Sequence, residues 1–568
     1  MMKKTNAICI SVGAAAIVMA GGCSKKLGQF QSDFFSTNPT PLETVGENVP
    51  GTVTAKLPPK FMLRNAKVSA TPVLQWQTAG DTFGEAMANP VVFQGENVRD
   101  NGQVVSFADG GTVNIPFSLA YQPEMAQSDL YLDFQVDQNG KIYTLPRVKV
   151  GNGVLATSTL ASAETVTPAV AKDGFQRVIS EQYSADIHFL VNQANVRASE
   201  TSKSEYIDLN RKLMEANAAP NMEIAGVTIN SYASPEGTLS FNTSLAEKRE
   251  KNTQSYVEGQ MKKDKITEFG ELTSSFTPED WEGFRSLVEK SNIQDKDLIL
   301  SVLSLYKDPE EREREIRNIS TVFNELADQI LPQLRYSRVM ATINVIGKSD
   351  QELIEIYNTD PQKLSIDEIL YVATLTDDNS KKMDIYSTAA RIYPNDYRAV
   401  NNLGLTQYEA GDYKAAAASF ERAGRMNPQS KEVEMNKGLI SMINKDYAKA
   451  NEQFGAAAGV PENADALGVY YLTQGDVNKA CTAFGDAKTN NAALAQILAK
   501  DYNQARSTLA SIPMPDATTY YLTAVLGART HNENMVMGNL RQAVKLDRTM
   551  LDKAKKDLEF AAYNLSYL

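Results

Sequence analysis

The chain has 568 residues, of which 42% are hydrophobic, and a formal net charge of −12 at pH 7. A chain of this length is expected to fold as several domains. The negative charge argues against nucleic acid or anionic lipid headgroups as partners. The chain contains two histidines, His188 and His531, far apart in the sequence, so a Cys/His metal cluster is not available and no cofactor is expected.

Residues 1–22 carry the pattern of a secretion signal. Lys3 and Lys4 precede an apolar stretch, 7–19, which is short for a membrane span and ends in small residues before Cys23. This pattern resembles a bacterial lipoprotein signal. The resemblance implies cleavage before Cys23 and acylation of that cysteine, where each buried methylene of the lipid contributes about 0.8 kcal/mol to anchoring. The alternative is an ordinary secretory peptide with Cys23 unmodified.

The residues after Cys23 bear on the location of the protein. They contain no acidic cluster of the kind that resembles the surface-export signals of Bacteroidetes lipoproteins. We therefore expect the periplasmic face of the outer membrane, with the cell surface as the alternative. Cys9 would leave with the signal, so Cys481 would be the one thiol left and no intramolecular disulfide is expected. Cys481 lies in a helical pattern, which favours a small buried thiol.

Two segments follow that differ in their periodicity. Residues 23–55 contain turn formers and little periodicity, which predicts a tether with some extended structure. From 56 to 155, short β-rich runs are separated by turns, and Leu130, Leu132 and Phe134 alternate with polar residues. This spacing predicts a small Ig-like β-sandwich, which could serve in docking or as a spacer. A small-residue linker, 156–171, comes next.

Residues 172–348 alternate between short apolar strands and amphipathic helices. The predicted strands cover 187–191, 227–231 and 341–345, and the predicted helices cover 205–216 and 242–261. About 70 residues separate the second helix from the last strand. Helices are predicted there at 281–290 and 310–330, the second with an acidic start that the helix dipole favours.

A motif within this region points to a specific ligand. A strand, 227–231, runs into a Pro-Gly turn, and Asn242, Leu245 and Arg249 follow on a helix. The pattern resembles the OmpA-like, peptidoglycan-associated domain, and the helical insert is similar to that of a Bacteroidetes subfamily. The resemblance implies an α+β domain with a βαβαβ core. It also implies a diaminopimelate site, in which a turn aspartate receives the ammonium and a helix arginine pairs with the carboxylate.

The motif departs from the family at one position of this site. Asn242, Leu245 and Arg249 match the family residues, but Ser234 stands where the family has aspartate. A serine hydroxyl offers no charge, and neutral hydrogen bonds are worth about half the 1.5–3 kcal/mol of charged ones. Glu236 could substitute if the turn aims it inward. The candidate peptidoglycan-binding residues are therefore Ser234, Glu236, Asn242 and Arg249; in the alternative, the domain docks proteins and Arg249 pairs with a local acidic neighbour.

The region 350–568 carries an internal repeat. The pattern Asp-Tyr-x-x-Ala-x-x-x-Phe-x-x-Ala begins at Asp412 and again at Asp446, which is 34 residues later, the period of tetratricopeptide repeats. Shortened copies begin at Asp476 and Asp501. Stacked helix pairs of this kind form an all-α solenoid with a concave groove for a partner. The candidate partner-binding residues on the first helices are Asn401, Asn402, Tyr408 and Asn436.

Together these patterns predict a multidomain protein with a β-sandwich, an α+β OmpA-like domain with a helical insert, and an all-α solenoid. No loop typical of an enzyme is evident, so a non-enzymatic role is expected. The expected function is an outer-membrane lipoprotein scaffold that recruits protein partners through its repeats. The alternative is a peptidoglycan-binding cell-wall anchor that uses Arg249.

Overall fold

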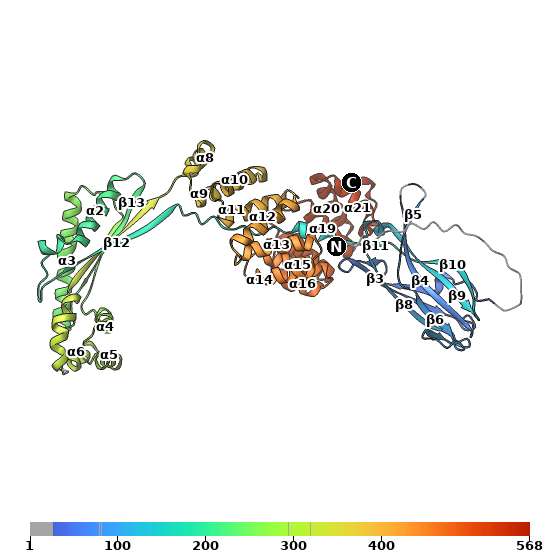
Figure 1. Ribbon diagram of the computed structural model, residues 1–568, viewed down its shortest axis with the longest axis horizontal. Coiled ribbons are helices and arrows are strands. Elements are labelled where there is room, and N and C mark those ends of the chain that lie inside the picture. The colour runs from blue at the N-terminus through green and yellow to red at the C-terminus, as the bar shows by residue number, and fades with distance from the viewer. Residues whose placement is uncertain (1–25, 79, 81, 294, 319) are drawn as a thin grey trace. The chain divides into compact units, whose positions relative to one another are not determined.

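The computed structural model describes residues 26–568 except 79, 81, 294 and 319, so the predicted lipidation site Cys23 lies outside the described residues. The chain divides into two units (Figure 1). The first unit combines the residues up to Ala171 with Tyr393–Leu568, and the second unit is the intervening Lys172–Ile392. Along the sequence, the residues of the second unit thus separate the two segments that make up the first.

The amino-terminal half of the first unit consists of two open sheets. The three-stranded sheet has the order β1 (Phe35–Asn38), β3 (Asn48–Leu57), β8 (Gly111–Ala120). The larger sheet has the order β10 (Lys141–Asn152), β9 (Ser128–Gln138), β4 (Ala66–Gln77), β6 (Val91–Gly95), β7 (Gln103–Val105), and β5 (Phe83–Met87) also pairs with β4. Apolar side chains of both sheets, such as Val53 and Leu132, share one core. The strands predicted from alternating apolar residues are confirmed.

The predicted tether, 23–55, is not a tether in its described part. Leu27 and Phe30 are buried in the core between the sheets, and β3 pairs with β8 along its whole length. The Pro50-Gly51 pair resembled a turn but lies inside β3. A Cβ atom at Gly51 would lie 2.5 Å from the ring of Phe117, so the glycine permits close packing here and does not mark a turn.

The small-residue linker, 156–171, is an ordered segment that we call the strap. It follows β11 (Val154–Leu155), which pairs in parallel with β2 (Leu42–Glu43). The strap forms two 3-10 turns, Thr157–Leu160 and Ala163–Thr165, and continues without helix or strand to Ala171. Several of its side chains are buried against the helices that form the second half of the unit.

The second half of the first unit is a stack of helix pairs. The pairs are α11 (Tyr397–Glu409) with α12 (Tyr413–Met426), α13 (Lys431–Ile443) with α14 (Tyr447–Ala456), α15 (Asn463–Thr473) with α16 (Val477–Phe484), α17 (Asn490–Leu498) with α18 (Tyr502–Ala510), and α19 (Ala517–Arg529) with α20 (Glu533–Leu546), followed by α21 (Thr549–Lys556). Each repeat aspartate caps a second helix; the side chain of Asp446, for example, accepts a hydrogen bond from the Lys449 backbone N–H. This caps one of the backbone donors that the helix start leaves unpaired.

The repeated glycines and phenylalanines fit together inside each pair. Phe454 is fully buried, and a Cβ atom on Gly438 would lie 2.5 Å from its ring. The same relation joins Gly404 to Phe420 and Gly468 to Phe484. The sequence pattern therefore describes a close approach of the first helix to the aromatic side chain of the second.

The second unit contains a four-stranded mixed sheet with the order β12 (Val178–His188), β15 (Tyr336–Ile346), β13 (Met222–Tyr232), β14 (Glu271–Thr277). Only β13 and β14 are parallel neighbours. The helices α2 (Ser204–Ala218) and α3 (Leu239–Lys263) bury side chains such as Leu209 and Val257 with one face of this sheet, and a short helix, α1 (Ala198–Thr201), precedes them. The predicted strands at 227–231 and 341–345 and both predicted helices are confirmed. The strand predicted at 187–191 is wrong in its bounds, because β12 ends at His188, and Leu190 and Val191 after it are exposed. The strand β14 was not predicted because its apolar residues are few.

The insert before β15 has a core of its own. It contains α4 (Trp281–Lys290), α5 (Lys296–Leu305), α6 (Pro309–Asn318) and α7 (Ser320–Glu325), followed by a π-helical turn, Leu326–Ile330. The helix predicted over 310–330 is thus three elements, and α5 was not predicted. The unit ends with α8 (Asp350–Thr359), α9 (Ile366–Thr374) and α10 (Asn379–Ile392), so the predicted domain start at residue 350 lies well before the division at 392/393.

Candidate functional site: asparagines that hold the strap

Asparagines occupy a repeated position on the first helices of three repeats. Asn402 on α11, Asn436 on α13 and Asn491 on α17 each lie ten residues before the aspartate that caps the following helix. All three side chains are buried. Because equivalent positions of stacked repeats face the same way, the three carboxamides line one surface, which we call the groove.

The carboxamides hold the backbone of the strap. Asn436 Oδ1 accepts a hydrogen bond from the Ala169 N–H at 2.7 Å, and its Nδ2 donates to the Ala169 carbonyl at 2.8 Å. Asn402 makes the same two contacts with Ala171, both at 2.9 Å. Each asparagine thus satisfies the donor and the acceptor of one strap residue, as a neighbouring strand would.

Further side chains extend this contact toward the start of the strap. Asn401 Nδ2 donates to the Ala169 carbonyl at 3.1 Å, and its Oδ1 accepts from Asn436 at 2.9 Å. The Tyr408 hydroxyl donates to the Ala163 carbonyl at 2.5 Å, and burial raises the pKa of this phenol. Asn491 accepts from the Thr165 hydroxyl at 3.1 Å. The asparagine contacts of Ala171, Ala169 and Thr165 fall on successively later repeats, so this part of the strap runs antiparallel to the order of the repeats.

The four residues predicted to bind a partner all contact the strap instead of free solvent. The structure brings Asn401, Asn402, Tyr408 and Asn436 together in the groove, and the chain's own backbone occupies them. Asn491 was missed, although its ten-residue distance from Asp501 could have identified it. The occupant was missed because its run of small residues is typical of a linker.

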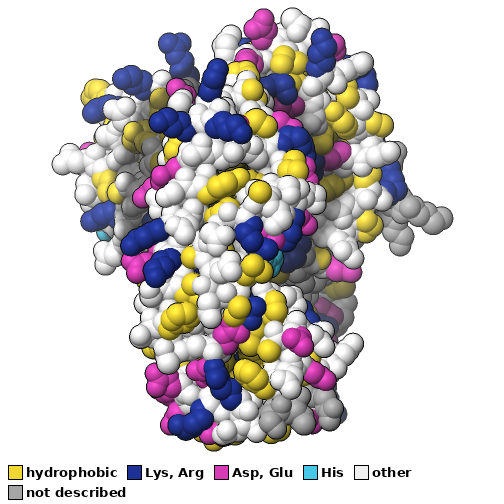
Figure 2. Space-filling view, turned by 90° about the vertical axis from the view of Figure 1, so that its left-hand side faces the viewer, with side chains coloured by type: hydrophobic (Ala, Val, Ile, Leu, Met, Phe, Trp, Pro, Cys, Tyr) yellow, Lys and Arg dark blue, Asp and Glu magenta, His cyan; other side chains and the backbone are white. Residues whose placement is uncertain are grey.

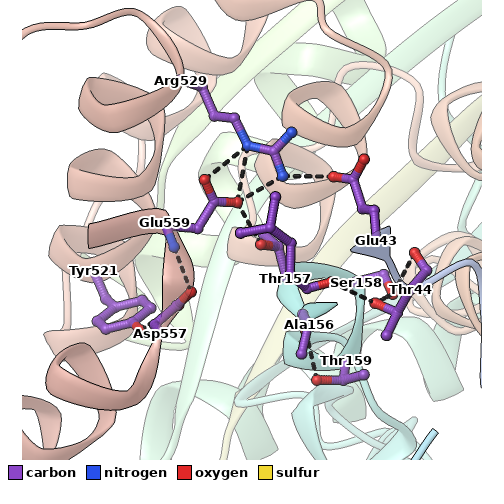
Figure 3. Close-up of polar contacts among 11 residues, drawn as sticks. Glu43, Thr44, Ala156, Thr157, Ser158, Thr159, Tyr521, Arg529, Asp557 and Glu559 are labelled. Carbon is purple, nitrogen blue, oxygen red and sulfur yellow. Dashed lines mark hydrogen bonds and ion pairs between the residues drawn. The ribbon is translucent and has the colours of Figure 1, made fainter. Parts of the chain in front are cut away.

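A charged cluster holds the start of the strap (Figure 3). Arg529 on α19 donates to Glu559 at 2.6 Å and to Glu43 of β2 at 2.5 Å. The Thr157 hydroxyl donates to the same Glu559 carboxylate at 2.6 Å, so three distant segments meet here. Burial raises the pKa of the Glu559 carboxyl, and the Arg529 guanidinium acts in the opposite direction. Ser158 lies 2.6 Å from the Thr44 hydroxyl beside this cluster.

In the second unit, the candidate ammonium site is occupied by an arginine of the same chain. Arg335, at the start of β15, donates from Nε to Glu236 Oε1 at 3.0 Å and from Nη2 to Oε2 at 2.8 Å. The Ser234 hydroxyl donates to Glu236 at 2.9 Å. The structure therefore brings Ser234 and Glu236 together, with the Glu236 carboxylate already paired to Arg335. The sequence analysis gave Arg335 no role in this site, because it lies 99 residues from Glu236.

The candidate arginine is buried among backbone carbonyls. Arg249 is fully buried and donates to the carbonyl groups of Tyr232 at 2.8 Å and Gln193 at 3.0 Å, and its guanidinium lies over the Phe189 ring at 5.0 Å. Burial lowers its pKa to about 10, and repulsion from Arg335 adds to this effect. Arg249 therefore links the end of β13 to the loop after β12 through these hydrogen bonds.

The remaining motif residue, Asn242, organises the turn. Its Nδ2 donates to the Gly237 carbonyl at 2.9 Å and to the Glu279 carboxylate at 3.1 Å. Asn242 is almost fully buried. Its contacts therefore hold the turn against the start of the helical insert.

One face of the second unit has a mixed surface. Figure 2 shows basic, acidic and apolar side chains interspersed on this side without one dominant kind. On α2 and α3, ion pairs such as Arg211–Glu215 and Lys251–Glu247 balance the charge locally. Such a surface provides no strong field of one sign for a polyanionic partner.

Within residues 26–568, apart from the four omitted positions, no group of three or more His, Cys, Asp or Glu side chains could hold a metal ion. None of the described helices is both long and apolar enough to cross a bilayer. Cys481 is half-buried, and burial raises the pKa of its thiol, which favours the unreactive protonated form.

Comparison with known proteins identifies the repeats. The family model described as a tetratricopeptide repeat matches residues 385–431 and 401–465, which confirms the repeat prediction for this part of the chain. No curated protein matches the chain.

Solved structures with similar helical stacks cover about a third of the chain. The APC/C hetero-tetramer Cut9-Hcn1 has a TM-score of 0.33 and 15% identity over 37% of this chain and 46% of that chain. A tetratricopeptide repeat protein from Parabacteroides merdae has a TM-score of 0.30 and 12% identity over 37% and 91%. Pseudomonas aeruginosa PilF has a TM-score of 0.28 and 15% identity over 38% and 99%.

Proposed function

We propose that this protein is a non-enzymatic lipoprotein scaffold of the outer membrane, of a Bacteroidetes type, that recruits protein partners through its tetratricopeptide repeats. The observation that carries this proposal is the groove, in which Asn402 and Asn436 already hold an extended polypeptide by its backbone. Tetratricopeptide repeats are typical protein-interaction modules. Membrane attachment through Cys23 follows from the sequence pattern alone.

We also propose that the second unit is an OmpA-like domain that serves in docking. Its mixed sheet, its two helices on one sheet face and its strand–turn–helix junction support this assignment. Glu236 is paired with Arg335, and Arg249 is buried and donates to backbone carbonyls. A ligand ammonium would have to displace Arg335, and a ligand carboxylate would have to expose Arg249. These two costs favour docking over the alternative role as a peptidoglycan anchor.

Affinity capture tests the scaffold role. The full-length chain and a chain with residues 172–392 replaced by a flexible linker are used to capture proteins from detergent-solubilised membranes. Because the first unit has its own cores, we expect the shortened chain to retain the main partners. A partner set that depends entirely on the second unit, or no specific partner for either chain, would contradict recruitment by the repeats.

Removal of the predicted acylation site is expected to release the protein from the membrane. In a Cys23→Ala variant no thiol remains to carry diacylglycerol, so the mature chain should appear in the periplasmic fraction. Cell fractionation with immunoblotting measures this, and Cys481→Ala is the matched control, which should remain with the outer membrane. Unchanged membrane association of Cys23→Ala would refute the lipid anchor.

Purified peptidoglycan is expected to retain little of the protein. The Glu236–Arg335 pair occupies the candidate ammonium site, so cosedimentation of the wild-type chain should be close to that of Arg249→Ala. An Arg335→Gln variant, which frees the Glu236 carboxylate, should bind more than either. Strong wild-type binding that Arg249→Ala abolishes would favour the wall-anchor role instead.

A further inference from the structure

The groove side chains form hydrogen bonds with the backbone of the strap and not with its side chains at Ala163, Ala169 and Ala171. Asn402 and Asn436 each contact one N–H and one carbonyl, while Asn401 and Tyr408 contact carbonyls. Every residue except proline offers both backbone groups. The hydrogen bonds therefore require an extended chain but do not require the particular sequence of the strap.

The groove selects for small side chains at the positions that it holds. Ala163, Ala169 and Ala171 are at least 94% buried, since their exposed fractions are 6%, 0% and 1%. The side chain of Val170, between two held residues, is 41% exposed. This alternation is that of an extended chain with one side against the helices. A larger or charged side chain at a held position would have no room.

A cavity borders the first half of the strap. This cavity of about 580 Å³ lies beside residues 158–164 and is lined from the other side by residues such as Met442, Tyr447 and Leu472. From Val166 to Ala171 the strap belongs to no helix or strand. In this stretch the strap contacts the groove through its hydrogen bonds and through side chains no larger than valine.

We propose that the groove is a receptor for an extended peptide of a partner protein, with small uncharged side chains at alternate positions, and that the strap is a built-in ligand which this peptide displaces. The inference rests on the proposed scaffold role and specifies the chemistry of its partner. Because the strap is tethered, it competes at an effective concentration on the order of millimolar. The protein therefore binds such a partner weakly until the strap is released.

Peptide binding to a variant with a released strap tests the proposal. In Ala169→Glu the full-length chain keeps every groove residue, but the strap carries a charged side chain at a fully buried position. A fluorescent peptide with the sequence of residues 160–172 is added, and its anisotropy is measured. We expect Ala169→Glu to bind the peptide at least tenfold more tightly than the wild-type chain. The same peptide with glutamate at the position of Ala169 should not bind.

Matched variants identify the site of binding. Val170→Glu places the same charge at the exposed neighbouring position, so it should keep the strap in place and bind as weakly as the wild-type chain. Adding Asn436→Leu to Ala169→Glu should abolish binding, because the contacts to Ala169 are lost. No binding by a folded Ala169→Glu chain, or binding that Asn436→Leu leaves unchanged, would overturn the proposal.

Hydrogen exchange of the wild-type chain provides a second test, which does not depend on the folding of Ala169→Glu. In the wild-type chain, the Ala169 and Ala171 amides donate to groove asparagines. If the strap opens locally, these amides should exchange at least a hundredfold faster than the core amides of α13. If the strap amides exchange only when the whole chain unfolds, the strap does not leave the groove in the folded protein, and the proposal is overturned. If the strap is permanent while partner capture persists, the scaffold role stands and recruits through another surface.

Discussion

Replacing Arg529 with methionine is expected to destabilise the first unit by about 3–5 kcal/mol, which is the usual effect of removing one partner of a buried ion pair. Glu559 is 4% exposed on its side chain and Glu43 27%, and both would lose their cation. The strap would also loosen at Thr157, because Glu559 accepts its hydroxyl. Urea denaturation of the full-length chain, followed by circular dichroism, measures the change in free energy of unfolding.

Two further variants control this experiment. Arg541→Met removes an exposed arginine from the neighbouring helix α20 and should change stability by less than about 0.5 kcal/mol. Adding Glu559→Gln to Arg529→Met should restore part of the loss, because one uncompensated charge is removed. If the Arg529→Met chain is as stable as the Arg541→Met chain, the charged cluster around Arg529 contributes nothing to the stability of the first unit.

Adding a methyl group at Gly438 is expected to destabilise the repeats by about 1–3 kcal/mol, which is typical of overpacking a core. The new Cβ would lie 2.5 Å from the Phe454 ring, which is itself fully buried. Thermal denaturation of Gly438→Ala against the wild-type chain measures the effect. The double variant with Phe454→Leu should lose less than the sum of the two single variants, because the smaller side chain relieves the clash.

Replacing a second helical glycine with alanine should have the opposite effect on stability. Gly455, near the end of α14, has no atom within 4 Å of an added Cβ. Gly455→Ala should therefore stabilise the chain by up to about 1 kcal/mol, because glycine costs conformational entropy in a helix. Equal effects at the two positions would mean that helix propensity, and not the contact with Phe454, determines the outcome.

The predictions from sequence succeeded where short-range patterns determine the structure. The recurrence of aspartate, glycine and phenylalanine predicted the helix pairs, because each residue has a local role as a cap or a close contact. The alternation around Leu132 predicted β9, and the strand–turn–helix motif predicted β13 and α3. The predicted tether is wrong because Pro50 and Gly51, which are typical turn residues, lie within β3.

The candidate sites could be predicted only in part. The sequence identified Ser234, Glu236, Asn242 and Arg249, and the structure gathers them near one turn. It did not reveal that Arg335 pairs with Glu236, because nothing local to either residue indicates the other. The chemical meaning of the motif therefore depended on a side chain from a distant strand.

The repeats, their asparagines and the strand–turn–helix junction are predictable from sequence, because caps, periodicity and close glycine contacts act within a few tens of residues. What the asparagines hold became visible in the folded chain. Ala169 and Asn436 are 267 residues apart, and a linker of small residues carries no signal for the surface that it will cover. Backbone groups that leave the solvent must find a partner, and the carboxamides of the groove provide it.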